Sequence, residues 1–202
     1  MEFLEDFNDD ELSVTISELL VATADSSDPL LDDSVSELLH TMRQRMDMDV
    51  VFVSEFIDGQ RMFRHVDAAP GAPGIIAGEC NPAEESVCQR VVEGRVPELI
   101  RDLGKVPKQD LPDIPFQIGA HLSTPIVLTD KRVYGTLCCF SAAPRPELVQ
   151  AHMDKLKMCA TLVARKVEKS RALGMTEPPP DWKLEPKAEY VSPVWQQAPR
   201  RA

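Results

Sequence analysis

Residues 119–145 read GAHLSTPIVLTDKRVYGTLCCFSAAPR, and the fold of the chain can be worked out from this stretch. Two runs rich in apolar and β-branched residues, 120–128 and 132–142, flank a short polar turn, TDK. Runs of this kind joined by a polar turn predict a β-hairpin. The second run leads into an amphipathic segment over 146–172, so a long helix is expected directly after the hairpin.

A second hairpin is predicted upstream of the first. VVFVSEF (50–56) and RMFRHVD (61–67) have strand composition, and the Asp-Gly pair between them is a strong turn signal. A helix is predicted before this hairpin, over about 33–48, because apolar residues recur there at spacings of three and four. These apolar residues are Val35, Leu38, Leu39, Met42 and Met46.

The chain between the two hairpins is mostly irregular. Residues 68–82 and 102–118 are rich in loop-forming residues and predict two long loops. A short helix is expected over 83–93, ending at Gly94, followed by a short strand over 96–100. No βαβ crossover joins the hairpins. The order therefore predicts an α+β fold, an antiparallel β-sheet with helices on one face.

The net charge of −11 belongs to the N-terminal end of the chain. Residues 1–40 carry twelve Asp or Glu and no Lys or Arg, whereas 41–202 carry 21 acidic and 22 basic residues. A chain of this sign gains nothing from counterion release at a phosphate backbone, so no nucleic-acid partner is expected. No apolar run approaches the roughly 18 residues of a membrane span, so no membrane partner is expected either.

Five cysteines occur without a CxxC pair or the Cys/His spacing of zinc sites. Together with the lack of a signal peptide, this predicts a cytoplasmic protein with reduced thiols and no metal site. Three regions are expected: an acidic N-terminal segment with a short amphipathic helix (1–32), a folded domain (33–172) and a Pro-rich disordered tail (173–202). The tail contains isolated Trp182, Tyr190 and Trp195, which could be short motifs for a protein partner.

With these elements in this order, the chain resembles a GAF domain. In the core hairpin, a strand with Pro125 near its middle turns into a strand with the aromatic-Gly pair Tyr134-Gly135. The stretch ESVCQRVVEGRVPELIRD (85–102) is also similar to a GAF variant, in which a Cys-Gln-Arg helix ends in Gly-Arg-x-Pro. The resemblance covers roughly residues 33–170. It implies a PAS-like sensory module, with a loop-covered pocket on the sheet face that the helices leave open.

Alternation along the core hairpin predicts which side chains face this pocket. On its first strand, His121 and Ser123 point away from the apolar set that suits the helix layer. On its second strand, Cys138 and Phe140 share the pocket side. In phytochrome GAF domains, which the hairpin resembles, the first strand gives small polar side chains to the chromophore. The full set of predicted ligand-binding residues is His121, Ser123, Cys138, Phe140, Cys88 and Arg90.

His121 is a lone imidazole among apolar neighbours. It could ligate haem iron, bind an anion when protonated, hydrogen-bond a neutral ligand, or be a satisfied pocket histidine. Cys88 is predicted to wall the pocket, because a free cysteine is most often a small buried hydrophobe. A reactive thiolate needs a low pKa, and a position in the middle of the helix over 83–93 does not supply one. Arg90 or Arg95 could reach an anionic ligand or remain solvated.

Several GAF activities can be tested by their motifs. The Cys-His pair that attaches a bilin in phytochrome-type relatives is missing, since none of the four histidines follows a cysteine. The Asn-Lys-x-Asp-Glu pattern of cyclic-GMP-binding GAF domains is absent as well. Cys80 and Cys88 are only weakly similar to the cysteine set of free methionine sulfoxide reductases. Covalent bilin and cyclic GMP are therefore disfavoured, and the sequence names no cofactor.

The function predicted from the sequence is a non-catalytic sensory or regulatory module that binds a small molecule, a protein partner or both. One alternative is a thiol-based redox enzyme or redox sensor using Cys80, Cys88 and the pair Cys138-Cys139. Another alternative is a ligand-free adaptor that acts through its acidic head and aromatic tail.

A homodimer is expected from the resemblance, because helices that flank GAF domains often pair across a two-fold axis. The N-terminal helix over 9–22 has only three to four turns, and a helix that short is marginal in water unless its apolar face is buried. On the long C-terminal helix, Met153, Lys157 and Ala160 are expected at the edge that is available to a partner.

Overall fold

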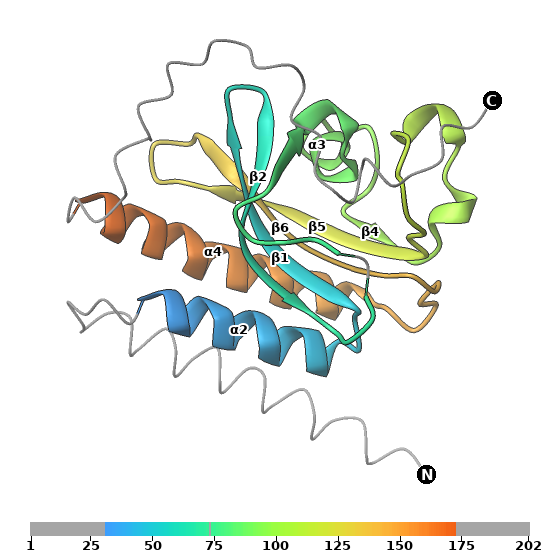
Figure 1. The fold of residues 1–202 in the computed structure, drawn as a ribbon, viewed down its shortest axis with the longest axis horizontal. Coiled ribbons are helices and arrows are strands. Elements are labelled where there is room, and N and C mark those ends of the chain that lie inside the picture. The colour runs from blue at the N-terminus through green and yellow to red at the C-terminus, as the bar shows by residue number, and fades with distance from the viewer. Residues whose placement is uncertain (1–30, 73, 173–202) are drawn as a thin grey trace.

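The computed structural model describes residues 31–72 and 74–172. The predicted N-terminal helix over 9–22 and the Pro-rich tail lie outside the described residues. The described chain forms one antiparallel sheet with the strand order β3-β2-β1-β6-β5-β4 (Figure 1). The strands are β1 (Val50–Ile57), β2 (Gln60–Ala68), β3 (Cys80–Pro82), β4 (Leu99–Ile100), β5 (Ala120–Val127) and β6 (Val133–Ser141).

Within residues 31–172, three α-helices are described with the sheet: α2 (Leu31–Arg45), α3 (Val87–Val92) and α4 (Gln150–Ala172). Short 3-10 turns lie at Ala83–Glu85, Leu103–Lys105 and Lys108–Asp110. Figure 1 shows α2 and α4 side by side against one face of the sheet. The predicted α+β fold, with two hairpins and flanking helices, is confirmed. Among the described helices, none is both long and apolar enough to span a membrane.

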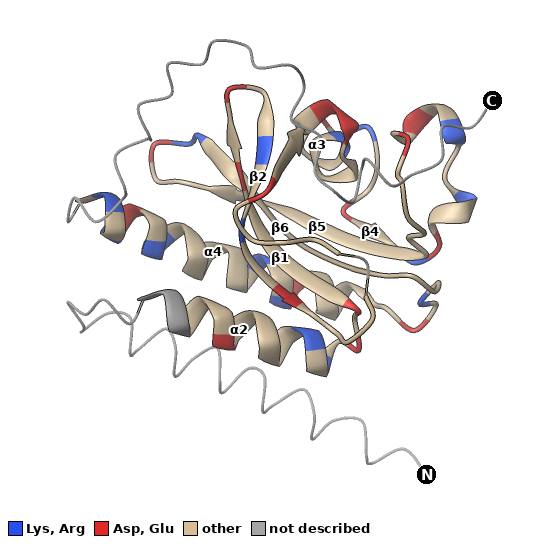
Figure 2. Cartoon of the chain, viewed as in Figure 1, with Lys and Arg blue, Asp and Glu red and all other residues tan. Residues whose placement is uncertain are grey.

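The two predicted hairpins, β1–β2 and β5–β6, are joined at the centre of the sheet by the pairing of β1 with β6. Val50 lies opposite Phe140 and Ser54 lies opposite Thr136 in this pairing. It is a contact between residues more than 80 positions apart, so it brings the two halves of the chain into one sheet. Neither β5 nor β6 contains a Lys, Arg, Asp or Glu residue, and both are tan in Figure 2.

Several predicted boundaries are wrong. The strand expected over 96–100 is only Leu99–Ile100. The predicted loop over 68–82 ends in a strand, β3, which pairs with β2 at the edge of the sheet. Helix α4 begins at Gln150, because residues 145–149 are held as a turn by backbone and side-chain bonds to Arg101. Helix α3 begins at Val87 after a 3-10 turn, so Cys88 is its second residue and does not lie mid-helix.

The main hydrophobic core lies between the sheet and the helices α2 and α4. Leu39 of α2, Leu137 of β6 and Leu156 of α4 have no exposed surface in this core. Met153 and Ala160 also lie in it and are only 1% and 3% exposed. The prediction that these two residues lie at an edge available to a partner is therefore wrong.

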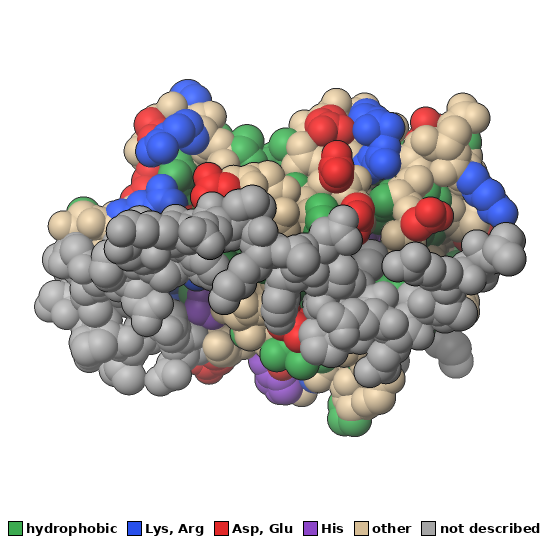
Figure 3. Space-filling view, turned by 45° about the horizontal axis from the view of Figure 1, so that its top comes forward, with side chains coloured by type: hydrophobic (Ala, Val, Ile, Leu, Met, Phe, Trp, Pro, Cys, Tyr) green, Lys and Arg blue, Asp and Glu red, His purple; other side chains and the backbone are tan. Residues whose placement is uncertain are grey.

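The opposite face of the sheet is covered by α3 and by the loops that join β2 to β3 and β4 to β5, which together we call the loop layer. Phe52, Cys138 and Phe140 of the sheet pack here against side chains of this layer. Phe116 of the β4–β5 loop stacks on Phe140, with ring centroids 5.6 Å apart. On the surface shown in Figure 3, acidic and basic side chains are interspersed with small apolar spots along the upper edge.

Replacing Gly135 by alanine is expected to destabilise the domain strongly. A Cβ atom at this position would lie 1.9 Å from the carbonyl oxygen of Ser54, on the neighbouring strand β1. Backbone of a central strand cannot give way easily, so the free energy of unfolding should fall by at least about 2 kcal/mol, as measured by urea unfolding. The matched control is Gly104→Ala, whose Cβ would meet the Asp102 side chain at 3.2 Å. An unchanged urea midpoint for Gly135→Ala would contradict the pairing of β1 with β6.

Candidate functional site

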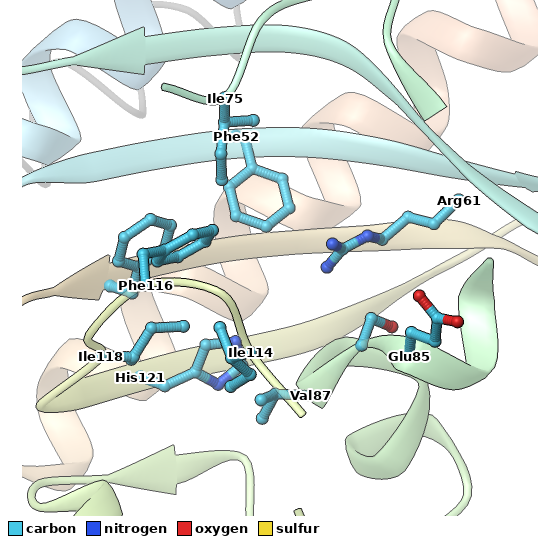
Figure 4. Close-up of a pocket in the computed structure, with 11 residues that line it drawn as sticks. Phe52, Arg61, Ile75, Glu85, Val87, Ile114, Phe116, Ile118 and His121 are labelled. Atoms are coloured by element: carbon cyan, nitrogen blue, oxygen red, sulfur yellow. The ribbon is translucent and has the colours of Figure 1, made fainter. Parts of the chain in front are cut away.

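A small cavity lies between the sheet and the loop layer (Figure 4). Its volume is about 20 Å³, which is room for about one water molecule. Apolar side chains form most of its wall, and three aromatic rings from the sheet and the loop layer belong to it: Phe52, Phe116 and Phe140. Four polar residues complete the wall: Arg61, Glu85, Ser86 and His121.

Arg61 is 6% exposed and extends from β2 into the site, with its guanidinium pointing toward the other residues that line the cavity (Figure 4). The guanidinium carbon lies 5.7 Å from the ring centroid of Phe52 and 4.7 Å from that of Phe63. Nε and Nη2 donate to Oδ1 of Asn81 at 3.1 and 3.0 Å, and Nη1 donates to Sγ of Cys88 at 3.3 Å. In the described part of the chain, no ion pair joins Arg61 to a carboxylate. The sulfur of Cys88 is thus the group in contact with it that can carry negative charge.

Cys88 and Cys138 face each other directly under this arginine. Their sulfur atoms are 2.9 Å apart, and both residues are buried, at 1% and 0% exposure. Cys88 comes from α3 and Cys138 from β6, so the contact joins the loop layer to the sheet. Hydroxyls surround the second sulfur: Oγ of Ser123 lies 3.0 Å from Sγ of Cys138, and Oγ1 of Thr136 lies 3.1 Å from it.

The two thiols have opposite electrostatic environments. Burial raises the pKa of Cys88, but the hydrogen bond from Cys138, the Arg61 guanidinium and His121 outweigh it and hold this pKa well below its ordinary value. The pKa of Cys138 is raised, first by burial and then by the adjacent Cys88 sulfur. Of the two sulfurs, Cys88 is therefore the one whose surroundings favour the thiolate, and the surroundings of Cys138 favour the protonated thiol.

His121 lies on β5, beside both the cavity and the thiol pair. Its Nε2 is 3.8 Å from Sγ of Cys88. Its Nδ1 is buried and has no hydrogen-bond partner among the described residues, although the residue is only 2% exposed. A buried polar atom without a partner costs free energy, so Nδ1 is a position where a bound molecule would gain a hydrogen bond.

The structure brings most of the predicted site residues together and leaves one aside. His121 and Phe140 line the cavity, while Cys88, Cys138 and Ser123 form a buried polar layer next to it. Arg90 does not line the cavity. The role of all six predicted residues in ligand binding remains a prediction.

The redox alternative that includes Cys80 is not supported by the arrangement of the thiols. Cys80 lies on the edge strand β3, is partly exposed, and its pKa is raised by burial and by Glu79. It is not part of the group in which Cys88, His121 and Cys138 place their donor atoms within 4.8 Å of one another.

Arg61 is the residue that sequence reasoning missed. A signal for it exists in the strand RMFRHVD, where alternation places Arg61 on the same face as Phe63. An arginine at an inward position of a strand indicates a buried charge that needs a partner. The aromatic wall from Phe52 and Phe116 had a weaker signal, because Phe116 lies in a loop without periodicity.

The cavity can be tested against the cofactors raised by the sequence. At about 20 Å³, the space beside His121 holds neither a haem nor a bilin. Either molecule would require the loop layer to move away from the sheet. The residues present therefore do not fit these cofactors in this state of the domain.

An antiparallel sheet with helices on one face and a loop-covered polar site on the other defines the class of small α+β sensory domains. Within that class, a family model for the GAF domain matches residues 30–168. The chain belongs to the GAF domain family, whose members are in general sensory or regulatory modules without catalytic activity. No curated protein matches the sequence.

Solved structures agree with this family. The GAF domain of a phosphoenolpyruvate-protein phosphotransferase from Coxiella burnetii is 14% identical, with a TM-score of 0.66 over 83% of this chain and 99% of that chain. Free methionine-R-sulfoxide reductase from Neisseria meningitidis, solved with its substrate, is 14% identical, with a TM-score of 0.62 over 80% and 91%. A phycocyanobilin-bound GAF domain from a cyanobacterial phytochrome is 14% identical, with a TM-score of 0.61 over 80% and 96%. At these identities the likeness shows the fold alone.

The electrostatics of the thiol pair predict a thiolate in the native protein at neutral pH. Because the pKa of Cys88 lies below its ordinary value, thiolate ultraviolet absorbance should be present at neutral pH and fall on acidification. Cys88→Ser should remove this absorbance, and Cys80→Ser, the control with a raised pKa, should retain it. An identical absorbance titration for the parent and Cys88→Ser proteins would show that Cys88 is an ordinary thiol.

Proposed function

We propose that this GAF domain is a sensory module for a small apolar molecule that carries a carboxylate. The observation that carries the proposal is the buried Arg61 guanidinium at the wall of the cavity, which forms no ion pair with a carboxylate among the described residues. The Cys88 sulfur is the one group in contact with Arg61 among the described residues that can carry negative charge, so a ligand carboxylate that adds a second anionic contact to the buried guanidinium gains binding free energy.

The hydrogen bonds of Arg61 leave room for such a ligand. A guanidinium has five N–H donors, and three are used by Asn81 and Cys88. The remaining donors can bind a carboxylate, and the rings of Phe52, Phe116 and Phe140 offer an apolar surface for the rest of the ligand. Nδ1 of His121 supplies a further polar contact on the same wall.

A ligand of this kind requires the cavity to open, because the present volume holds about one water molecule. The part of the wall most suited to move is the end of the β4–β5 loop, with Ile114, Phe116 and Ile118. These residues are only partly buried and lie outside regular structure, so their displacement costs less than that of a strand. Binding would therefore shift the loop layer from a closed to an open arrangement.

The signal from the cavity has a physical route to α4. Three residues after Arg61, Arg64 on the same strand donates to Oε2 of Glu55 at 2.6 Å, and Arg171 of α4 donates to Oε1 of the same carboxylate at 3.3 Å. Tyr134 also donates to Glu55, and Arg171 lies over the Tyr134 ring at 5.3 Å. A shift of β2 on ligand binding would therefore change the contact between Glu55 and Arg171, near the C-terminal end of α4. Whether α4 acts on a protein partner or a second copy stays a prediction, since the N-terminal helix expected to pair lies outside the described residues.

Benzoate is a suitable probe, because it joins an aromatic ring to a carboxylate. Benzoate should raise the melting temperature, whereas benzyl alcohol, of similar shape and without charge, should not. At a hundredfold excess over Kd the stabilisation is about 2.7 kcal/mol, a rise in Tm of several degrees. Isothermal titration calorimetry should report one site per chain.

The matched variants are two arginines of β2. Arg61→Met should abolish the stabilisation by benzoate, whereas Arg64→Met, which changes an arginine outside the cavity wall, should retain it. Equal stabilisation of the parent and Arg61→Met proteins would refute the assignment of the carboxylate to Arg61. A failure of both benzoate and cyclohexanecarboxylate to bind the parent would reject the ligand class.

A further inference from the structure

We propose that Cys88 and Cys138 are a peroxide-responsive thiol pair, in which Cys88 is the attacking sulfur and Cys138 closes a reversible disulfide. This inference goes beyond ligand binding and does not rest on the carboxylate proposed above. It rests on the contact between the two sulfurs, on the cation beside one of them and on the size of the adjoining cavity.

The sulfur atoms are already close to bonding distance. They lie 2.9 Å apart, against roughly 2.05 Å in a disulfide. To form a disulfide, α3 therefore has to move only a short distance toward β6. A bond between these residues would fasten the loop layer to the sheet covalently, at the wall of the cavity.

The surroundings assign different roles to the two sulfurs. Cys88 accepts a hydrogen bond from Nη1 of Arg61 at 3.3 Å and lies 3.8 Å from Nε2 of His121, so positive and polar groups stabilise its thiolate. Within the described residues, the hydrogen-bonding contacts of Cys138 other than Cys88 are the neutral hydroxyls of Ser123 and Thr136. A thiolate next to a protonated thiol is the arrangement in which one sulfur attacks and the second resolves.

The cavity favours a small oxidant. Its volume of about 20 Å³ admits a molecule of the size of water, and hydrogen peroxide is only slightly larger. Arg61 and His121 line the cavity and both lie beside Sγ of Cys88. An oxidant in the cavity is therefore separated from the thiolate by side chains that can move, whereas glutathione or a disulfide has no room in the closed site.

The chemistry balances with peroxide as the oxidant. The Cys88 thiolate attacks one oxygen of hydrogen peroxide, an S–O bond forms, the O–O bond breaks, and hydroxide leaves and is protonated to water. Cys138 then loses its proton and attacks the Cys88 sulfenic sulfur. The S–S bond forms as the S–O bond breaks, and hydroxide leaves with that proton as a second water. Two thiols are oxidised to a disulfide while the peroxide is reduced by two electrons, and an external thiol reverses the change.

The remaining cysteines provide a contrast. Cys139 follows Cys138 on β6 but points to the helix face, where it packs in the main core near Cys159. Burial raises the pKa of Cys159 to about 12 and raises that of Cys139 further. These two thiols are kept protonated, away from the cavity.

A metal ion is a weaker explanation for the same residues. The donor atoms of Cys88, His121 and Cys138 lie within 4.8 Å of one another, which would suit a soft metal. However, the Arg61 guanidinium stands 3.3 Å from one of the sulfurs and would repel a cation. A histidine that binds a metal almost always donates its other N–H to a partner, and Nδ1 of His121 has none among the described residues.

The test treats the full chain with hydrogen peroxide, blocks the remaining thiols and maps disulfides by mass spectrometry of tryptic peptides. One intramolecular bond between Cys88 and Cys138 is expected, and dithiothreitol should reverse it. Cys138 and Cys139 lie on one tryptic peptide, and Cys80 and Cys88 lie on another. Cys139→Ala and Cys80→Ser therefore serve as matched controls, and both should retain the cross-link. In Cys138→Ser, dimedone should instead trap a sulfenic acid on Cys88.

A second measurement tests the role assigned to Arg61. Arg61→Met should slow oxidation at neutral pH by about tenfold or more, because each unit by which the thiol pKa rises lowers the thiolate fraction up to tenfold. Arg61→Lys, which keeps a positive charge, should recover part of the rate, and circular dichroism checks that each variant is folded.

Three results would overturn the proposal. The first is a peroxide-treated parent protein in which Cys88 and Cys138 both remain alkylatable under conditions that oxidise the unfolded chain. The second is a cross-link that persists in Cys138→Ser. The third is one equivalent of zinc in the purified parent protein that is lost in Cys88→Ser, which would establish the metal site instead.

Discussion

The burial of the Arg61 guanidinium beneath the loop layer is the constraint on which the site depends. An isolated buried charge costs several kcal/mol, so other groups of the domain must compensate the charge of Arg61. Asn81 supplies a neutral acceptor, two phenylalanine rings supply their electron-rich faces, and Cys88 supplies a sulfur that can ionise. The hydrogen bond from Cys138 and then the Arg61 guanidinium lower the pKa of Cys88, so the ionised sulfur is an anion that can compensate the buried arginine.

The same constraint links the two proposals. A carboxylate ligand and the Cys88 thiolate both compensate the charge of Arg61, so each weakens the electrostatic gain of the other. Oxidation of Cys88 to a disulfide would remove the thiolate and leave the guanidinium with neutral partners only. The oxidised domain would therefore have a stronger need for an anionic ligand than the reduced one. By thermodynamic reciprocity, a bound carboxylate would in turn favour the oxidised pair.

Sequence patterns predicted the scaffold well, because two hairpins and two amphipathic helices have strong local periodicities. Alternation on β5 and β6 also placed His121 and Cys138 on the loop side of the sheet, away from Leu122 and Cys139. The meeting of Cys88 with Cys138 and Arg61 could not be predicted, because it depends on how an irregular loop and a six-residue helix settle on the sheet. Residue spacing along the chain contains no information on that packing.

The sheet itself connects the site to the helix layer. Adjacent positions on β2 point in opposite directions, and the register shift opposite Val53 and Ser54 adds one residue near Arg64. Arg61 and Phe63 consequently face the loops, whereas Arg64 reaches Glu55, where Arg171 of α4 also binds. A ligand or disulfide that altered the position of Arg61 would act on the strand that also holds Arg64, and Arg64 shares the Glu55 carboxylate with Arg171 of α4.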